Sequence, residues 1–107
     1  MLRTKCLMSD YLFEVVDKTG RKIRLTKERW SHITHPSSLH SYMTNYLEDV
    51  EQVLIKPDRI SDSVYDINKA NYYKYYKNRK QYLRVIVRYL NGDGFVISAY
   101  FVKNISI

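Results

Sequence analysis

The chain has 107 residues, 45% of them hydrophobic, which is enough to close one core without disulfides and too few to suggest a second domain. Lysine and arginine outnumber aspartate and glutamate by 18 to 11, and the resulting net charge of +7 favours a polyanionic partner such as nucleic acid. No apolar run reaches the roughly 20 residues that cross a bilayer, no signal peptide is recognisable, and Cys6 is alone, so we expect a cytoplasmic protein with no membrane partner.

The first third of the chain predicts a β-hairpin followed by a helix. Alternating apolar residues predict strands over residues 11–16 and 22–25, joined by a turn in which Gly20 is free to take positive φ. Thr26 is a typical N-cap, so a helix should begin at the next residue and end before Pro36. Residues 1–10 are expected to form a loosely ordered segment.

The rest of the chain predicts a second helix and then strands. Apolar residues recur at three- and four-residue steps over residues 46–54, Asn45 and Glu48 stand in capping-box order, and Pro57 should stop the helix. Four strands are then expected, over residues 59–65, 72–77, 81–90 and 95–102. The order predicts a single α+β domain with two helices packed on one face of an antiparallel β-sheet.

Pairing the last three strands predicts which side chains share a face. A loop over residues 91–93 matches the apolar sets of the final two strands, with Val87 opposite Ile97 and Val85 opposite Ala99. A loop over residues 78–80 places Lys74 opposite Arg84. One face should then carry Tyr72, Lys74, Tyr76, Arg84, Arg88, Ser98 and Tyr100.

The predicted pairing of Lys74 with Arg84 favours an anion on this face, because like charges directly opposite each other destabilise a sheet. The alternative is an ordinary solvated face, on which lysine and arginine stems cover tyrosine rings.

His32 and His35 lie close together near the end of the first predicted helix. Histidine suits general acid or base catalysis near neutral pH. The alternative role is a hydrogen bond from a helix-end histidine to nearby carbonyl groups. No metal site is expected, because one cysteine and three histidines do not offer the paired spacings of zinc ligands. His40, Asp62 and Asp66 are interpreted as polar residues of loops and the surface.

Several short motifs follow one another along the chain in a characteristic order. They are Glu28 to Ile33 followed by His35-Pro36, Lys56 to Ile60, Tyr72-Tyr73-Lys74 and Gly94 to Tyr100. Their order resembles the phage- and toxin-associated branch of the barnase, EndoU, colicin-nuclease and RelE-like superfamily, over about Leu12 to Val102. The resemblance implies helices packed on a curved antiparallel sheet and metal-independent RNA cleavage, in which the ribose 2′-hydroxyl attacks the adjacent phosphate.

The residues of this chain that match the superfamily's motifs would have the roles of the corresponding catalytic residues. The helix histidine would be His32 or His35, the basic residue of the tyrosine-rich strand Lys74, and the hydroxyl of the last strand Ser98. The chain departs from the barnase-like pattern because no glutamate lies in the four strands predicted after the helices to act as base, and no histidine follows residue 40. The general acid and the general base are therefore unassigned.

The sequence thus predicts a small ribonuclease that needs no cofactor and has RNA as its substrate. The chain would act as a toxin, and its protein partner would be an antitoxin or immunity protein. The candidate catalytic residues are His32, His35, Lys74 and Ser98, and the candidate nucleic-acid contacts are Arg84, Arg88, Tyr72, Tyr76 and Tyr100. Two alternatives stay open: a non-catalytic module that binds RNA or single-stranded nucleic acid, and a protein-interaction domain whose tyrosines dock onto a partner.

Overall fold

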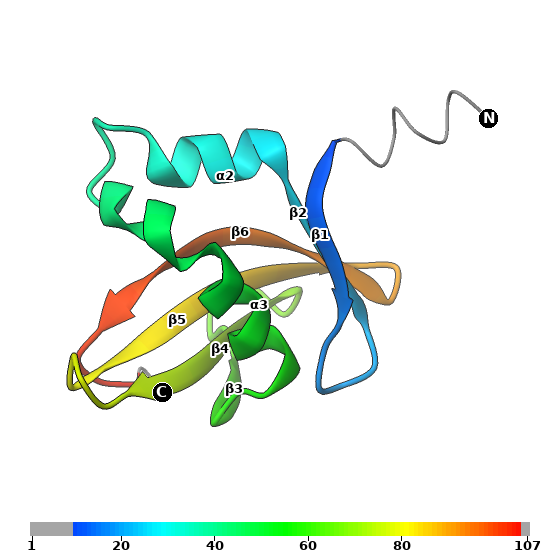
Figure 1. Cartoon of the computed structure of the whole chain (residues 1–107). Helices are drawn as coiled ribbons and strands as arrows, with labels where there is room; N and C mark the ends of the chain where they lie inside the picture. Colours follow the sequence, from blue (N-terminus) through cyan, green and yellow to red (C-terminus); the bar gives the residue numbers. More distant parts are fainter. Residues whose placement is uncertain (1–9, 106–107) are drawn as a thin grey trace.

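Residues 10–105, which the computed structural model describes, form an α+β fold of one mixed β-sheet and two α-helices (Figure 1). The elements are β1 (Tyr11–Val16), β2 (Lys22–Thr26), α2 (Lys27–Thr34), the 3₁₀ helix η1 (Ser41–Tyr46), α3 (Leu47–Ile55), β3 (Arg59–Asp62), β4 (Lys69–Tyr76), β5 (Gln81–Leu90) and β6 (Asp93–Val102). No helix in this part of the chain is long and apolar enough to span a bilayer. The loosely ordered segment predicted for residues 1–10 falls outside the described residues, Asp10 apart.

The six strands follow the order β1-β2-β6-β5-β4-β3. Four of the neighbouring pairs are antiparallel, but β2 runs parallel to β6, with Ile23 opposite Gly94. The expectation of a wholly antiparallel sheet is therefore wrong at this pairing. Side-chain alternation fixes which face a strand presents and says nothing of which strand will lie beside it.

Both helices cover the same face of the sheet, as predicted (Figure 1). Helix α2 packs on β2 and β6, and α3 packs on β1, β4 and β5. Between them and the sheet lies the apolar core, which includes Ile23, Leu25, Ile33, Met43, Val50, Val53, Leu54, Leu83, Val85, Val87, Val96 and Ala99. We call the covered side of the sheet the helix face and the other side the open face.

Helix α2 begins as the sequence predicts and α3 does not. The Thr26 hydroxyl accepts a hydrogen bond from the amide of Arg29 at 3.0 Å, and the helix ends at Thr34, two residues before Pro36. Helix α3 follows directly from η1 and has no side-chain cap, so the predicted Asn45 capping box is wrong. The 3₁₀ turn already continues the chain into α3 and occupies the place of a cap.

The β5–β6 connection is shorter than the predicted loop. Asn91 and Gly92, with φ of 53° and 87°, form a two-residue turn that pairs Leu90 with Asp93. A β-bulge next to Val87 then takes up one extra residue of β6, so the predicted pairing of Val85 with Ala99 is confirmed.

The bulge changes which residues of β6 reach the core. Before it, the register is one residue off the predicted one, so Val87 faces Val96 instead of Ile97. Val96 is buried, whereas Ile97, which was predicted to face the core opposite Val87, is half-buried and lies outside the core cluster, as does Phe95. Gly94 sits where a Cβ would approach Ile23 Cδ1 to 2.8 Å, so the close packing of β2 on β6 requires glycine there.

A buried carboxylate ties the β1–β2 turn to the middle of the sheet. Asp17 is only 5% exposed, and its Oδ1 accepts hydrogen bonds from the amides of Thr19 and Arg21, both at 2.9 Å. Its Oδ2 accepts a hydrogen bond from the Tyr72 hydroxyl, which lies 2.8 Å from the Tyr89 hydroxyl. Burial, with the hydrogen bonds to Asp17 and Tyr89, raises the pKa of Tyr72, so this phenol remains protonated.

Replacement of Asp17 should therefore destabilise the fold. Asp17→Ala leaves the Tyr72 hydroxyl and two turn amides without their acceptor, and we expect a loss of about 3 kcal/mol of unfolding free energy. Urea denaturation followed by circular dichroism measures it. Asp62→Ala is the control, since Asp62 is exposed and its carboxylate accepts no hydrogen bond within residues 10–105. This variant should change the free energy of unfolding by less than about 0.5 kcal/mol. Equal losses would contradict the anchoring role.

Candidate nucleic-acid interface

The β4–β5 pairing reverses the predicted faces of β4. The connecting loop is Lys77 to Lys80, one residue longer than predicted, so Tyr76 faces Gln81 and Lys74 faces Leu83. A one-residue shift moves every side chain of a strand to the other face. The predicted contact between Lys74 and Arg84 is therefore wrong, because the two side chains lie on opposite faces of the sheet.

Three residues predicted for the interface thus belong to the helix face, and each has a partner there. The Lys74 ammonium donates to the carbonyl of Lys56 at 3.2 Å. The Tyr76 hydroxyl donates to Asp49 Oδ1 at 2.7 Å, and burial, with this bond, raises the pKa of Tyr76. Tyr72 is fully buried against Asp17.

The open face gathers the other predicted residues. Its central strands carry Asn71, Tyr73 and Tyr75 on β4, Tyr82, Arg84, Ile86 and Arg88 on β5, and Ser98 and Tyr100 on β6. Arg84, Arg88, Ser98 and Tyr100 share this face, as the sequence predicts, and Tyr73 and Tyr75 stand where Tyr72 and Tyr76 were expected.

Arg84 is held in place at the centre of the open face. Its Nε and Nη2 donate to Asn71 Oδ1 at 3.4 and 3.2 Å, and its Nη1 donates to the Tyr100 hydroxyl at 3.0 Å. Among the described residues it has no carboxylate partner. A guanidinium has five N–H donors, so one N–H on each terminal nitrogen stays available. This is a preoriented, uncompensated cation suited to a phosphate.

Aromatic rings lie on both sides of Arg84 and form a row on this side of the sheet, in which Tyr73 is fully buried and the other rings reach solvent. The Tyr75 and Tyr82 ring centroids are 5.1 Å apart, and Tyr82 is 6.4 Å from Tyr73. The Arg84 guanidinium carbon lies 5.9 Å from the Tyr73 centroid and 5.6 Å from the Tyr100 centroid. Alternation of flat rings with a cation is the arrangement by which proteins bind single-stranded nucleic acid.

His40 lies at the end of this row, next to Tyr100. The sequence analysis interpreted it only as a polar residue of a loop or the surface. Its ring stacks on Tyr100 with centroids 4.4 Å apart and an interplanar angle of 18°. The loop is fixed to the sheet two residues later, where the Tyr42 hydroxyl accepts a hydrogen bond from the amide of Phe101 at 3.1 Å. No sequence signal links His40 to Tyr100, because the contact depends on how the α2–η1 loop packs against β6.

The two histidines predicted to be catalytic lie elsewhere. Exposed His32 lies on α2 and lines a cavity of about 140 Å³ with Thr26, Glu28 and Arg29. His35 is turned toward its own loop, where its Nδ1 is 2.7 Å from the Ser37 hydroxyl. Neither histidine makes a hydrogen bond, ion pair or ring contact with Arg84, Ser98 or Tyr100 in the part of the chain that the structure describes.

Arg88 has a different environment from Arg84. It lies directly opposite Lys69 on the open face, and its Nη1 is 3.6 Å from Asp66 Oδ2. The like-charge pair expected at Lys74 and Arg84 therefore exists at Lys69 and Arg88, where Asp66 supplies the anion.

No group of three or more His, Cys, Asp or Glu side chains that could hold a metal ion occurs between residues 10 and 105. A larger cavity, of about 560 Å³, lies at the start of α2 between Tyr11, Lys27 and Phe95. Comparison of the chain with protein-family models, with curated proteins and with solved structures finds no match. The candidate site therefore rests on its own geometry.

The observed register of β4 predicts different effects on stability when the neighbouring Tyr72 and Tyr73 are each replaced by phenylalanine. Tyr72→Phe removes a hydroxyl that bonds Asp17 and Tyr89, so we expect a loss of about 1–2 kcal/mol. The Tyr73 hydroxyl is buried and has no hydrogen-bond partner among the described residues, so Tyr73→Phe should leave stability unchanged or raise it by up to about 1 kcal/mol. Thermal and urea unfolding compare the two variants. A larger loss for Tyr73→Phe would contradict the observed register.

Proposed function

We propose that the chain binds single-stranded RNA across the open face and cleaves it without a metal ion. The observation that carries this proposal is Arg84, an uncompensated guanidinium that Asn71 and Tyr100 hold between aromatic rings. The net charge of +7 adds long-range attraction for a polyanion. Unpaired bases would stack on Tyr75, Tyr82 and Tyr100, whose rings are at least partly exposed. One backbone phosphate would bind Arg84.

The cleavage step places His40 and Tyr100 beside that phosphate. His40 accepts the proton of the ribose 2′-hydroxyl as its oxygen bonds to phosphorus, and the bond to the 5′-oxygen breaks to leave a cyclic phosphate. The Tyr100 hydroxyl, to which Arg84 already donates, gives a proton to the leaving oxygen, and Arg84 stabilises the charge that develops on the phosphate. Proton transfer from His40 back to Tyr100 restores both groups.

Two helices on one face of the sheet are compatible with the fold that the resemblance to the ribonuclease superfamily implies. We therefore propose that the chain belongs to this superfamily. A toxin role follows from it, with RNA of the cytoplasm as target and an antitoxin or immunity protein as partner. Ser98 shares the open face with Arg84 and would orient a non-bridging phosphate oxygen. His40 replaces His32 and His35 in this scheme, and Arg84 replaces Lys74.

Binding should depend on Arg84 more than on total charge. We expect Arg84→Ala to weaken binding of a single-stranded oligonucleotide about 10- to 100-fold and to reduce the slope of log affinity against log salt by about 0.7. Arg29→Ala, on the exposed surface of α2, removes the same charge from the other side of the sheet and should weaken binding less than about 3-fold at 0.15 M salt. Fluorescence anisotropy measures both. If Arg29→Ala weakened binding more than Arg84→Ala, the RNA would bind at α2, beside the cavity that His32 lines, and the proposed interface would be wrong.

Cleavage should depend on His40. End-labelled RNA incubated with the protein in excess chelator should yield fragments ending in cyclic phosphate, and His40→Ala should slow their formation about 100-fold or more while binding is retained. His32→Ala, His35→Ala and Lys74→Ala are the comparison variants and should keep most of the activity. Loss of cleavage in one of these variants alone would assign the chemistry to the helix face, and binding without cleavage in the wild type would leave a binding module.

A further inference from the structure

The loop between β3 and β4 presents apolar side chains to solvent. Val64 is 73% exposed, Tyr65 95% and Ile67 88%. Large apolar groups that protrude together from a folded domain are typical of a contact surface. The sequence predicts a strand as far as residue 65, but β3 ends at Asp62, so these residues belong to a separate loop.

This loop is held by hydrogen bonds along its length. The amide of Ser63 donates to the carbonyl of Lys69 at 3.0 Å, and the amide of Tyr89 donates to the carbonyl of Asn68 at 2.6 Å. The Ser63 hydroxyl accepts from the amide of Tyr65 at 3.2 Å. Four residues of one short segment are thus fixed to each other or to β5, so the protruding side chains extend from a hydrogen-bonded backbone.

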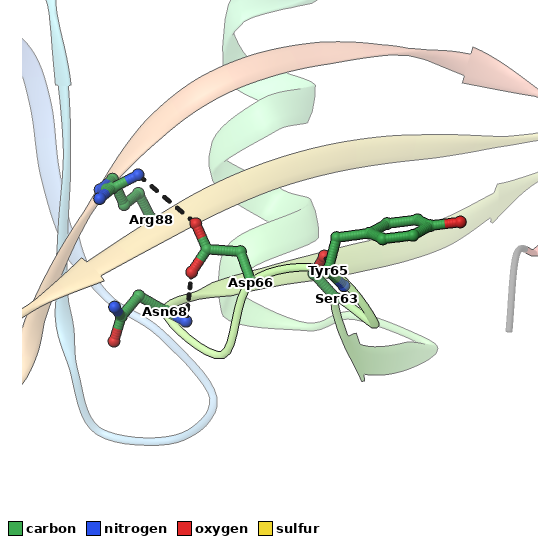
Figure 2. Close-up of polar contacts among 5 residues, drawn as sticks. All are labelled: Ser63, Tyr65, Asp66, Asn68 and Arg88. Atoms are coloured by element: carbon green, nitrogen blue, oxygen red, sulfur yellow. Dashed lines mark hydrogen bonds and ion pairs between the residues drawn. The ribbon is translucent and has the colours of Figure 1, made fainter.

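The position of the loop joins it to the open face. Asp66 accepts a hydrogen bond from the amide of Asn68 at 2.9 Å and pairs with Arg88, a side chain of the open face (Figure 2). Figure 2 also shows the Tyr65 ring extending away from Asp66 and Arg88, so neither covers it. Arg84 and Arg88 are four residues apart on β5, or about 13 Å along the strand, and point to the same side.

We propose that Tyr65 is a stacking platform for an unpaired base of the RNA whose phosphate binds Arg84. The charge around the loop favours this ligand, because Arg88 and Lys69 lie opposite each other beside it and the single carboxylate of Asp66 balances only one of these two cations. An exposed phenol ring with two free faces stacks on any base, whereas the aliphatic neighbours Val64 and Ile67 cannot. The proposal rests on the proposed function of the open face.

Stacking predicts a specific order of variants at position 65. Binding of a fluorescent oligouridylate should weaken about 10-fold or more for Tyr65→Ala and Tyr65→Leu and remain near wild type for Tyr65→Phe, which keeps the ring. A ribose-phosphate oligomer of the same length without bases should bind the wild type and Tyr65→Ala equally. The loop control is Ile67→Ala, which should bind oligouridylate like the wild type.

Tyr65→Trp allows base stacking at position 65 to be followed directly by tryptophan fluorescence. The natural chain has one tryptophan, Trp30, which packs against the core and provides the baseline. Emission of the new tryptophan should fall when oligouridylate is added and stay constant with the oligomer that lacks bases.

The outcomes separate this inference from the proposed function. If the wild type binds oligouridylate and Tyr65→Ala binds it equally well, the stacking platform is wrong and the Arg84 interface stands. If Ile67→Ala weakens binding as much as Tyr65→Ala, the loop makes a general apolar contact and stacking is again wrong. If the wild type binds no RNA while its fold is intact, the proposed function and the inference fall together.

Discussion

The buried carboxylate of Asp17 is the interaction on which the arrangement of the sheet depends. Burial of an ion is unfavourable unless its lone pairs are satisfied, and here the turn amides and the Tyr72 hydroxyl satisfy them. The adjacent amide of Lys18 donates to the carbonyl of Leu54, so the same turn is also fixed to the end of α3. Hairpin, helix and central strands therefore meet at one polar point inside an apolar core.

The position of Tyr72 determines what the open face contains. Because side chains alternate along a strand, a Tyr72 that points toward Asp17 forces Asn71 and Tyr73 to the opposite side, beside Arg84. A short β4–β5 loop would have placed Lys74 there instead. The candidate interface is thus a consequence of how the core satisfies a buried charge on the far side of the same strand.

Among residues 10–105, Arg84 at the centre of this face has no carboxylate partner, whereas Arg88 near its edge is paired with one. Arg84 is bonded to neutral oxygens only, whereas Arg88 is paired with Asp66 in an exposed contact that contributes about 0–1 kcal/mol. An incoming phosphate would gain more at Arg84, since no carboxylate of the described residues pairs with its guanidinium. Arg84 is half-buried, and partial removal from water strengthens an electrostatic attraction.

The sequence by itself determined the elements whose signals are local. The strands over 11–16 and 81–90 and the start of α2 at Lys27 have the predicted bounds, because alternation and an N-cap are complete within a few residues. Only the tertiary structure decided the face of β4 and the place of His40. Tyr72 and its partner Asp17 are 55 positions apart, and His40 reaches Tyr100 through loop packing, so neither contact leaves a periodic signal in the chain. Turn length and bulges, which shift a register by one residue, likewise depend on the packing of the whole sheet.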